Sequence, residues 1–208
     1  MCRMTENHLI KNRSTEIMDD TQDRGSAGYS SPDDSRFLAV TQGVIAGGVM
    51  CLCELVSAPL VNTLAGGAFT LLPWACVACL LSTVFVVVLG YAFLWLAGSL
   101  SRNFSGRAAP VCYGAVGMIS YGIWGGLVFP AVINSILKPA GLAEISGTGN
   151  WMIAVNCLII GMVSYCLAYI FAPMLARKRG TVIAIGVAVV AVALLGAFFL
   201  WRFYAQLH

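Results

Sequence analysis

Residues 181–201 read TVIAIGVAVVAVALLGAFFLW and contain no Asp, Glu, Lys or Arg. An α-helix of about 20 apolar residues is long enough to cross the hydrocarbon core of a bilayer, which is about 30 Å thick. Because a helix forms its backbone hydrogen bonds within the segment, it leaves no unsatisfied polar groups in lipid. This segment is therefore predicted to span a membrane as an α-helix.

Four further apolar segments precede this one, each long enough for a membrane crossing. They cover residues 37–61, 69–100, 110–137 and 151–175. The segment 69–100 is longer than one crossing requires, so we expect Pro73 to mark the start of its helix. The chain of 208 residues is 59% hydrophobic and 10% charged, whereas about a quarter of the residues in a soluble domain are charged. We predict an all-α membrane protein, a bundle of five transmembrane helices within residues 37–208.

The first 36 residues differ in composition from the rest of the chain. They contain seven of the nine acidic residues and are rich in Ser, Asp and Thr. Such a segment cannot bury enough apolar surface to offset the conformational entropy lost on folding. We therefore predict a disordered polar tail for residues 1–36.

The basic residues of the connecting loops indicate an orientation. Arg102 and Arg107 follow the second predicted span, and residues 177–179, with the sequence RKR, follow the fourth. Lys and Arg are enriched in cytoplasmic loops. We therefore expect a cytoplasmic N-terminus, an external C-terminus and a location in the plasma (inner) membrane. The RKR cluster is interpreted as a topological signal, with binding of anionic lipid or of a cytoplasmic partner as the alternative.

Several classes of chemistry lack the side chains that they need. The two histidines, His8 and His208, lie outside the predicted spans, and all Asp residues lie in the tail. This excludes a haem held by membrane histidines, a Ser–His protease and a paired-aspartate intramembrane protease. No P-loop motif is present, so any driving ATPase would be a separate chain. We expect no cofactor, no bound metal and no nucleic-acid partner, and an enzymatic role is the less favoured expectation.

Glu54 is the one acidic residue inside a predicted span. It lies 17 residues after Phe37, or about 26 Å along a helix. A carboxyl group at that depth is costly and indicates a functional site by default, here a proton or cation site. Two alternatives remain. The helix can end early, so that Glu54 faces headgroup water, or Glu54 can pair with Arg202 on the fifth span.

Other polar side chains fall at a similar depth on the same predicted side of the membrane. We therefore predict a substrate or ion path lined by Glu54, Asn134, Asn156 and Arg202. Asn62 and Lys138 lie nearby in the sequence pattern, and Pro130 can open the backbone of the third helix. The alternative is that these side chains only mark the water interface.

The eight cysteines include a CVAC motif at residues 76–79. Cys76 and Cys79 can cycle between dithiol and disulfide, which is typical of a membrane thiol oxidoreductase. Such enzymes usually carry a second cysteine pair on a loop, and the predicted outer loops contain no cysteine. Cys51 and Cys53, on the facing first helix, are alternative partners. The favoured interpretation is that these cysteines are small apolar packing residues.

No motif in the sequence identifies a family, so three functions remain. The first is a transport-type permease, or the membrane subunit of a transporter, with Glu54 near the substrate path. A weak repeat, in which VTQG at 40–43 aligns with VCYG at 111–114, is consistent with it. The second is an accessory protein that binds another membrane protein through small-residue faces such as Gly122 and Gly126. The third is a thiol oxidoreductase.

Overall fold

A computed structural model describes residues 32–67, 69–102 and 108–207 of the chain. Residues 1–31, most of the predicted tail, lie outside this set. The chain divides into units 1–37 and 38–208, and every packing contact described below lies within the second. The helices are α2 (Pro32–Leu64), α3 (Leu71–Phe85), η1 (Val86–Gly90), α4 (Tyr91–Ser101), α5 (Ala109–Leu137), α6 (Gly147–Leu175) and α7 (Arg179–Leu207).

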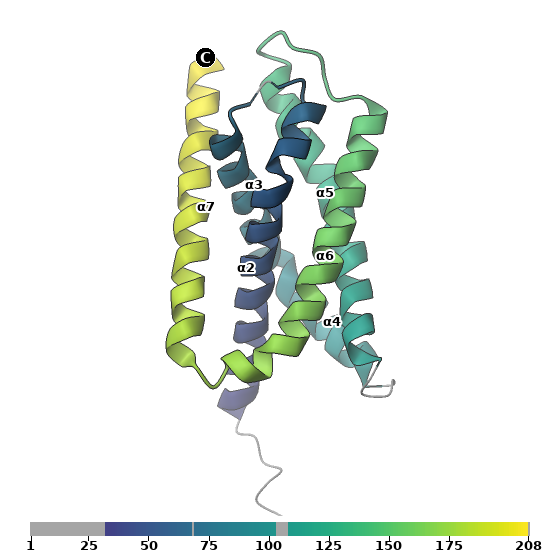
Figure 1. Ribbon diagram of the computed structural model, residues 1–208, viewed down its shortest axis with the longest axis vertical. Coiled ribbons are helices and arrows are strands. Elements are labelled where there is room, and N and C mark those ends of the chain that lie inside the picture. The colour runs from purple at the N-terminus through teal and green to yellow at the C-terminus, as the bar shows by residue number, and fades with distance from the viewer. Residues whose placement is uncertain (1–31, 68, 103–107, 208) are drawn as a thin grey trace, which may run out of the picture. The chain divides into compact units, whose positions relative to one another are not determined.

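Five of these helical stretches are long and apolar enough to cross a membrane, which confirms the predicted fold class. They are Arg36–Leu64, Leu71–Ser101, Ala109–Leu137, Gly147–Leu175 and Arg179–Gln206. Four of them are one to seven residues longer than the predicted spans, and the second is one residue shorter. The chain is therefore a polytopic integral membrane protein whose helices run side by side in an up-and-down bundle (Figure 1).

The second span is one continuous helical stretch built from α3, η1 and α4. Pro73 lies in the first turn of α3, two residues later than the start at Leu71, because proline is tolerated where the backbone N–H has no helical partner. The middle of the second span, Val86–Gly90, is a π-helix. This i→i+5 arrangement is rare and is frequent at functional sites when it occurs.

Helices α5 and α6 pack closely together, and glycine makes this approach possible. A Cβ atom on Gly117 would overlap Gly161 and Tyr165 of α6, and one on Gly125 would overlap Cys157. Removing the side chain lets two backbones approach closely in a membrane. The small residues on this face therefore pack within the chain.

The last helix, α7, lies at the edge of the bundle against α3 (Figure 1). Its approach depends on Gly196, where a Cβ atom would overlap the backbone of Cys76. Only 17% of an apolar 18-residue stretch of α7 is buried, against 39–50% for the corresponding stretches of the other four spans. Most of its surface is thus left to face lipid.

A buried carboxyl network as the candidate functional site

Glu54 lies inside the bundle and not at its boundary. Its span runs from Arg36 to Leu64, so Glu54 stands four residues beyond the middle of the span, which is about 6 Å along the axis. Its side chain is 1% exposed. The alternative in which this carboxyl faces headgroup water does not fit that burial.

Three helices supply hydrogen-bonding groups to this carboxyl network. The hydroxyl of Tyr121, on α5, donates to Glu54 Oε1 at 2.7 Å. Ser82, on α3, places its Oγ 2.6 Å from the Tyr121 hydroxyl and donates to the Ala78 carbonyl at 2.9 Å. Ser57, one turn after Glu54 on α2, donates to Glu54 Oε2 at 3.4 Å. The sequence indicated Glu54 alone and none of these partners.

Aromatic rings surround the network and keep it dry. Phe85 and Phe129 meet the Tyr121 ring edge-to-face, with ring centroids at 5.1 and 6.4 Å. The side chains of Tyr121, Phe85 and Phe129 are fully buried. Hydrogen bonds in such a low-dielectric environment are strong, and an unpaired polar group there is costly. The hydroxyl partners therefore satisfy Glu54 in a place that water does not reach.

No basic side chain neutralises Glu54 among residues 36–67, 69–102 and 108–206. Each Lys and Arg in those ranges is exposed, and the ion pair that they form joins Lys138 to Glu144 at 3.7 Å near the surface. Arg202 is exposed, so the predicted pairing of Glu54 with Arg202 is not formed. Within the described part of the chain, the side chains that hold the carboxyl are neutral hydroxyl groups.

Further hydroxyl groups lie in the bundle at other levels. Tyr165, on α6, donates to the Gly90 carbonyl at 3.4 Å, at the end of the π-helix. Tyr113 lies near the side chains of Gln42 and Ser101. These two residues and Tyr113 border a polar pocket of about 350 Å³ between α2, α4 and α5. Polar groups thus occur along the bundle from this pocket to Glu54.

The predicted path residues other than Glu54 have separate surroundings. The Asn134 side chain accepts from the Ile145 backbone N–H at 2.9 Å and so ties the loop between α5 and α6. Asn62 likewise accepts from the Phe69 N–H at 3.2 Å. The Nδ2 atom of Asn156 is buried and has no hydrogen-bond partner among the described groups. Within that set, the structure brings neither these residues nor Arg202 into hydrogen bonding with Glu54.

Cys51 and Cys79 pack against each other between α2 and α3. The Cys51 thiol donates to the Cys79 carbonyl at 3.8 Å, and the Cys79 thiol donates to the Cys51 carbonyl at 3.5 Å. Cys76 and Cys79 are only 5% and 3% exposed, and the cysteines of the described segments are free thiols. Thiol exchange needs access to a thiolate, so this burial favours packing over the oxidoreductase alternative.

Comparison of the chain with protein-family models, with characterised proteins and with solved structures finds no match.

Proposed function

We propose that this chain is a transport-type membrane protein, a permease or the membrane subunit of a transporter, in which Glu54 binds and releases a proton. The observation that carries the proposal is the hydrogen bond from the Tyr121 hydroxyl to a fully buried carboxyl in the middle of a span. Ionisable residues inside transmembrane segments are expensive and often belong to ion pathways or proton relays. A purely structural role could be filled by an apolar side chain at lower cost.

The network supports proton binding because it accommodates Glu54 in both protonation states. When Glu54 is ionised, Tyr121 donates to Oε1 and Ser82 donates to the Tyr121 oxygen. When Glu54 is protonated, it donates to Tyr121, which donates to Ser82, which donates to the Ala78 carbonyl. Each hydroxyl hydrogen has an acceptor in both arrangements. Reorientation of the hydroxyl groups therefore lets the same side-chain positions hold Glu54 with or without its proton.

The polar pocket beside Tyr113 supports access to the network from one end of the bundle. It is lined by the polar side chains of Gln42, Ser101 and Arg102. Tyr165 and its bond to the Gly90 carbonyl lie on the neighbouring helices. A proton entering from this pocket would meet hydroxyl groups rather than an entirely apolar interior.

Proton movement through the purified protein in liposomes tests the proposal. With a pH dye inside and an imposed membrane potential, the wild-type protein is expected to carry protons faster than empty vesicles. Glu54→Gln should abolish this flux, because an amide cannot give up a proton to the chain of hydroxyls. Glu144→Gln is the matched control, since Glu144 is an exposed loop acid, and it should keep the wild-type flux.

Infrared spectroscopy provides a readout that needs no transported solute. The carboxylic C=O band of a dry, protonated Glu54 should appear and disappear as the pH is varied, and Glu54→Gln should remove that change. A wild-type protein with neither proton flux nor a pH-dependent carboxyl band would refute the proposal. Glu54 would then be a structural residue.

A further inference from the structure

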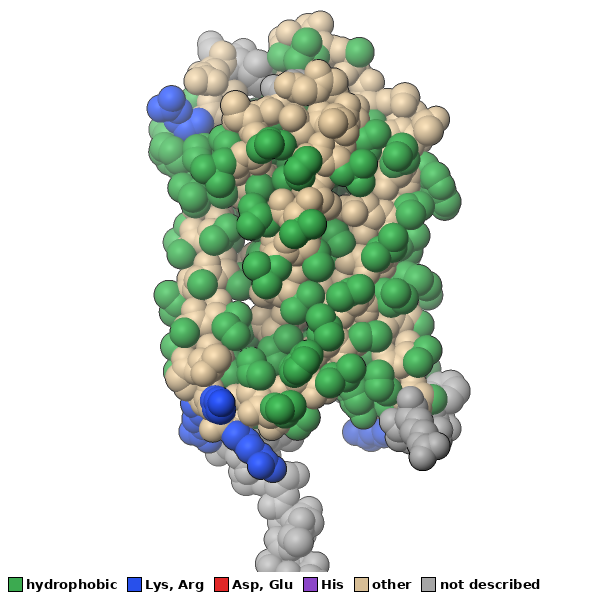
Figure 2. Space-filling model, in the orientation of Figure 1, with side chains coloured by type: hydrophobic (Ala, Val, Ile, Leu, Met, Phe, Trp, Pro, Cys, Tyr) green, Lys and Arg blue, Asp and Glu red, His purple; other side chains and the backbone are tan. Residues whose placement is uncertain are grey.

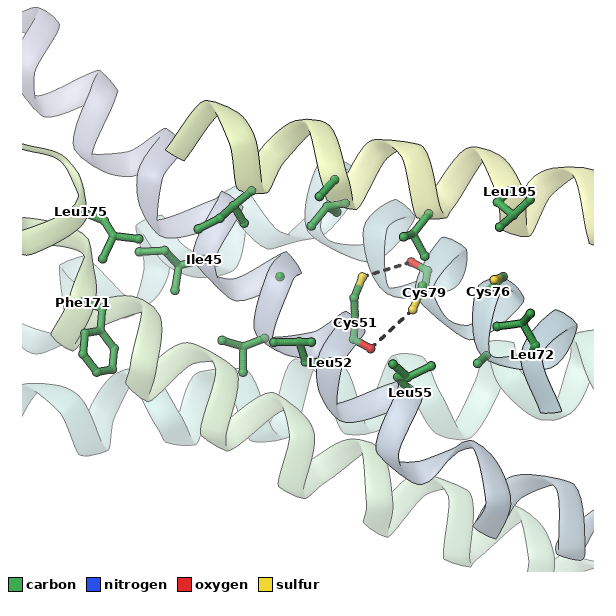
Figure 3. A pocket seen from close by; sticks show the side chains of 17 residues that line it. Ile45, Cys51, Leu52, Leu55, Leu72, Cys76, Cys79, Phe171, Leu175 and Leu195 are labelled. Atoms are coloured by element: carbon green, nitrogen blue, oxygen red, sulfur yellow. Dashed lines mark hydrogen bonds between the residues drawn. The ribbon is translucent and has the colours of Figure 1, made fainter. Parts of the chain in front are cut away.

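A long apolar groove runs along the bundle between α2, α3, α6 and α7 (Figure 3). Its volume is about 620 Å³, which falls within the range of about 300–1,000 Å³ that is typical of small-molecule sites. The lining is made of aliphatic and aromatic side chains and the three cysteines Cys51, Cys76 and Cys79. Water has no polar partner there, so an apolar ligand is the natural occupant.

The groove is long enough to hold an acyl chain. One face of α7 contributes residues from Ile185 to Leu195, and α2 contributes residues from Ile45 to Leu55. Ten residues of helix are about 15 Å long, and both stretches cross the middle of their spans. Because Phe171 and Leu175 at the end of α6 also line the groove, an acyl chain that enters at this end can follow the groove to the middle of the bundle.

One end of the groove lies beside the basic turn between α6 and α7. Phe171 and Leu175, at the end of α6, line this end (Figure 3). Arg177 and Lys178 lie in the turn between α6 and α7, and α7 begins at Arg179. All three basic side chains are exposed. Figure 2 shows basic side chains gathered at this end of the bundle, next to an apolar surface. Arg and Lys bind phosphate through charge-assisted hydrogen bonds.

We propose that this groove and the basic turn form a binding site for one anionic phospholipid. An acyl chain lies in the groove along α7, and the phosphate of the headgroup contacts Arg177 and Lys178. The apolar groove supplies the affinity for the chain, and the charge at its end selects anionic over zwitterionic headgroups. This site is distinct from the Glu54 network and does not depend on the proposed function.

Native mass spectrometry in a mild detergent tests the site, with a phosphatidylglycerol and a phosphatidylcholine of equal chain length added as probes. The wild-type protein should retain one phosphatidylglycerol at least about fivefold more than phosphatidylcholine. Ala188→Trp places an indole in the groove and should reduce retention of both lipids at least about fivefold. Its matched control is Ala191→Trp, because Ala191 is exposed on α7 and does not line the groove.

The headgroup contact is tested by the double variant Arg177→Gln/Lys178→Gln. It should lose the preference for phosphatidylglycerol while still binding a chain. Where Ala188→Trp is not monodisperse in detergent, the smaller change Ala188→Leu takes its place. Equal lipid retention by the Ala188 and Ala191 variants would overturn the proposal. Equal binding of the two lipids by the wild-type protein, or a bound apolar compound that is not a lipid, would do the same.

Discussion

Replacing Tyr121 with Phe isolates the hydrogen bond that defines the Glu54 network. The change removes one oxygen and keeps the ring, so the contacts with Phe85 and Phe129 persist. Ser82 loses the Tyr121 hydroxyl as a partner and keeps the Ala78 carbonyl as an acceptor. The 2.7 Å bond to Glu54 is therefore separated from the Ser82 contact by the coupling energy with a change at Glu54.

The size of the loss distinguishes the two states of the carboxyl. A hydrogen bond to a charged group contributes about 1.5–3 kcal/mol, whereas neutral hydrogen bonds between membrane helices average about 0.6 kcal/mol in double-mutant cycles. We expect the coupling energy between Tyr121→Phe and Glu54→Leu to be about 0.6 kcal/mol at acidic pH, where Glu54 is protonated. It should increase toward about 1.5–3 kcal/mol at a pH where Glu54 is ionised.

Reversible unfolding in mixed micelles measures this coupling energy through the four proteins of the cycle. Tyr204→Phe serves as the control, since its hydroxyl bonds Ser135 at an exposed site and should contribute little. A coupling energy below about 0.3 kcal/mol at every pH would refute the reasoning, because a hydrogen bond of this length in a low-dielectric site contributes to the free energy of unfolding.

Three further experiments test the packing of the helices and the surface of the protein. Gly117→Leu should reduce the free energy of unfolding by at least about 1–3 kcal/mol, because a side chain there overlaps α6. Gly180→Leu is the control, because the space around Gly180 is open. Equal unfolding midpoints for the two variants would contradict the close contact between α5 and α6. Lys138→Met should change the unfolding free energy by less than about 0.5 kcal/mol, since its pair with Glu144 is exposed, and a larger loss in the same assay would refute this. Cys157 is fully buried and should react with a membrane-impermeant maleimide only after denaturation. The mass of the protein measures the labelling. Labelling of Cys157 in the folded protein would show that α5 and α6 separate.

The five spans could be predicted because the length of an apolar run is itself the signal for a membrane helix. Their ends were less certain. The rule that proline marks a helix start placed the beginning of α3 at Pro73, whereas the first turn accepts proline without loss and the helix begins at Leu71.

The site could be predicted only in part. Glu54 was identifiable because a carboxyl inside an apolar run is conspicuous, but depth along a helix says nothing about rotation around its axis. Asn134 shares the predicted side of the membrane with Glu54, yet its side chain caps a loop. Tyr121 and Ser82 resemble many other polar residues of membrane helices until the packing places them beside the carboxyl. The π-helix at Val86–Gly90 has no sequence signal that we could identify.

That π-helix sets the rotation of α4 relative to α3. A π turn holds one residue more than an α turn, and each residue of an α-helix advances by about 100° around the axis. If Val86–Gly90 were α-helical, α4 would be turned by about 100° relative to α3, and Tyr91 would face away from Gly43, the glycine against which its ring packs. Ser82 lies before the π-helix, on α3. The π-helix therefore determines which side chains of α4 face the polar pocket, whereas the carboxyl network is built before it.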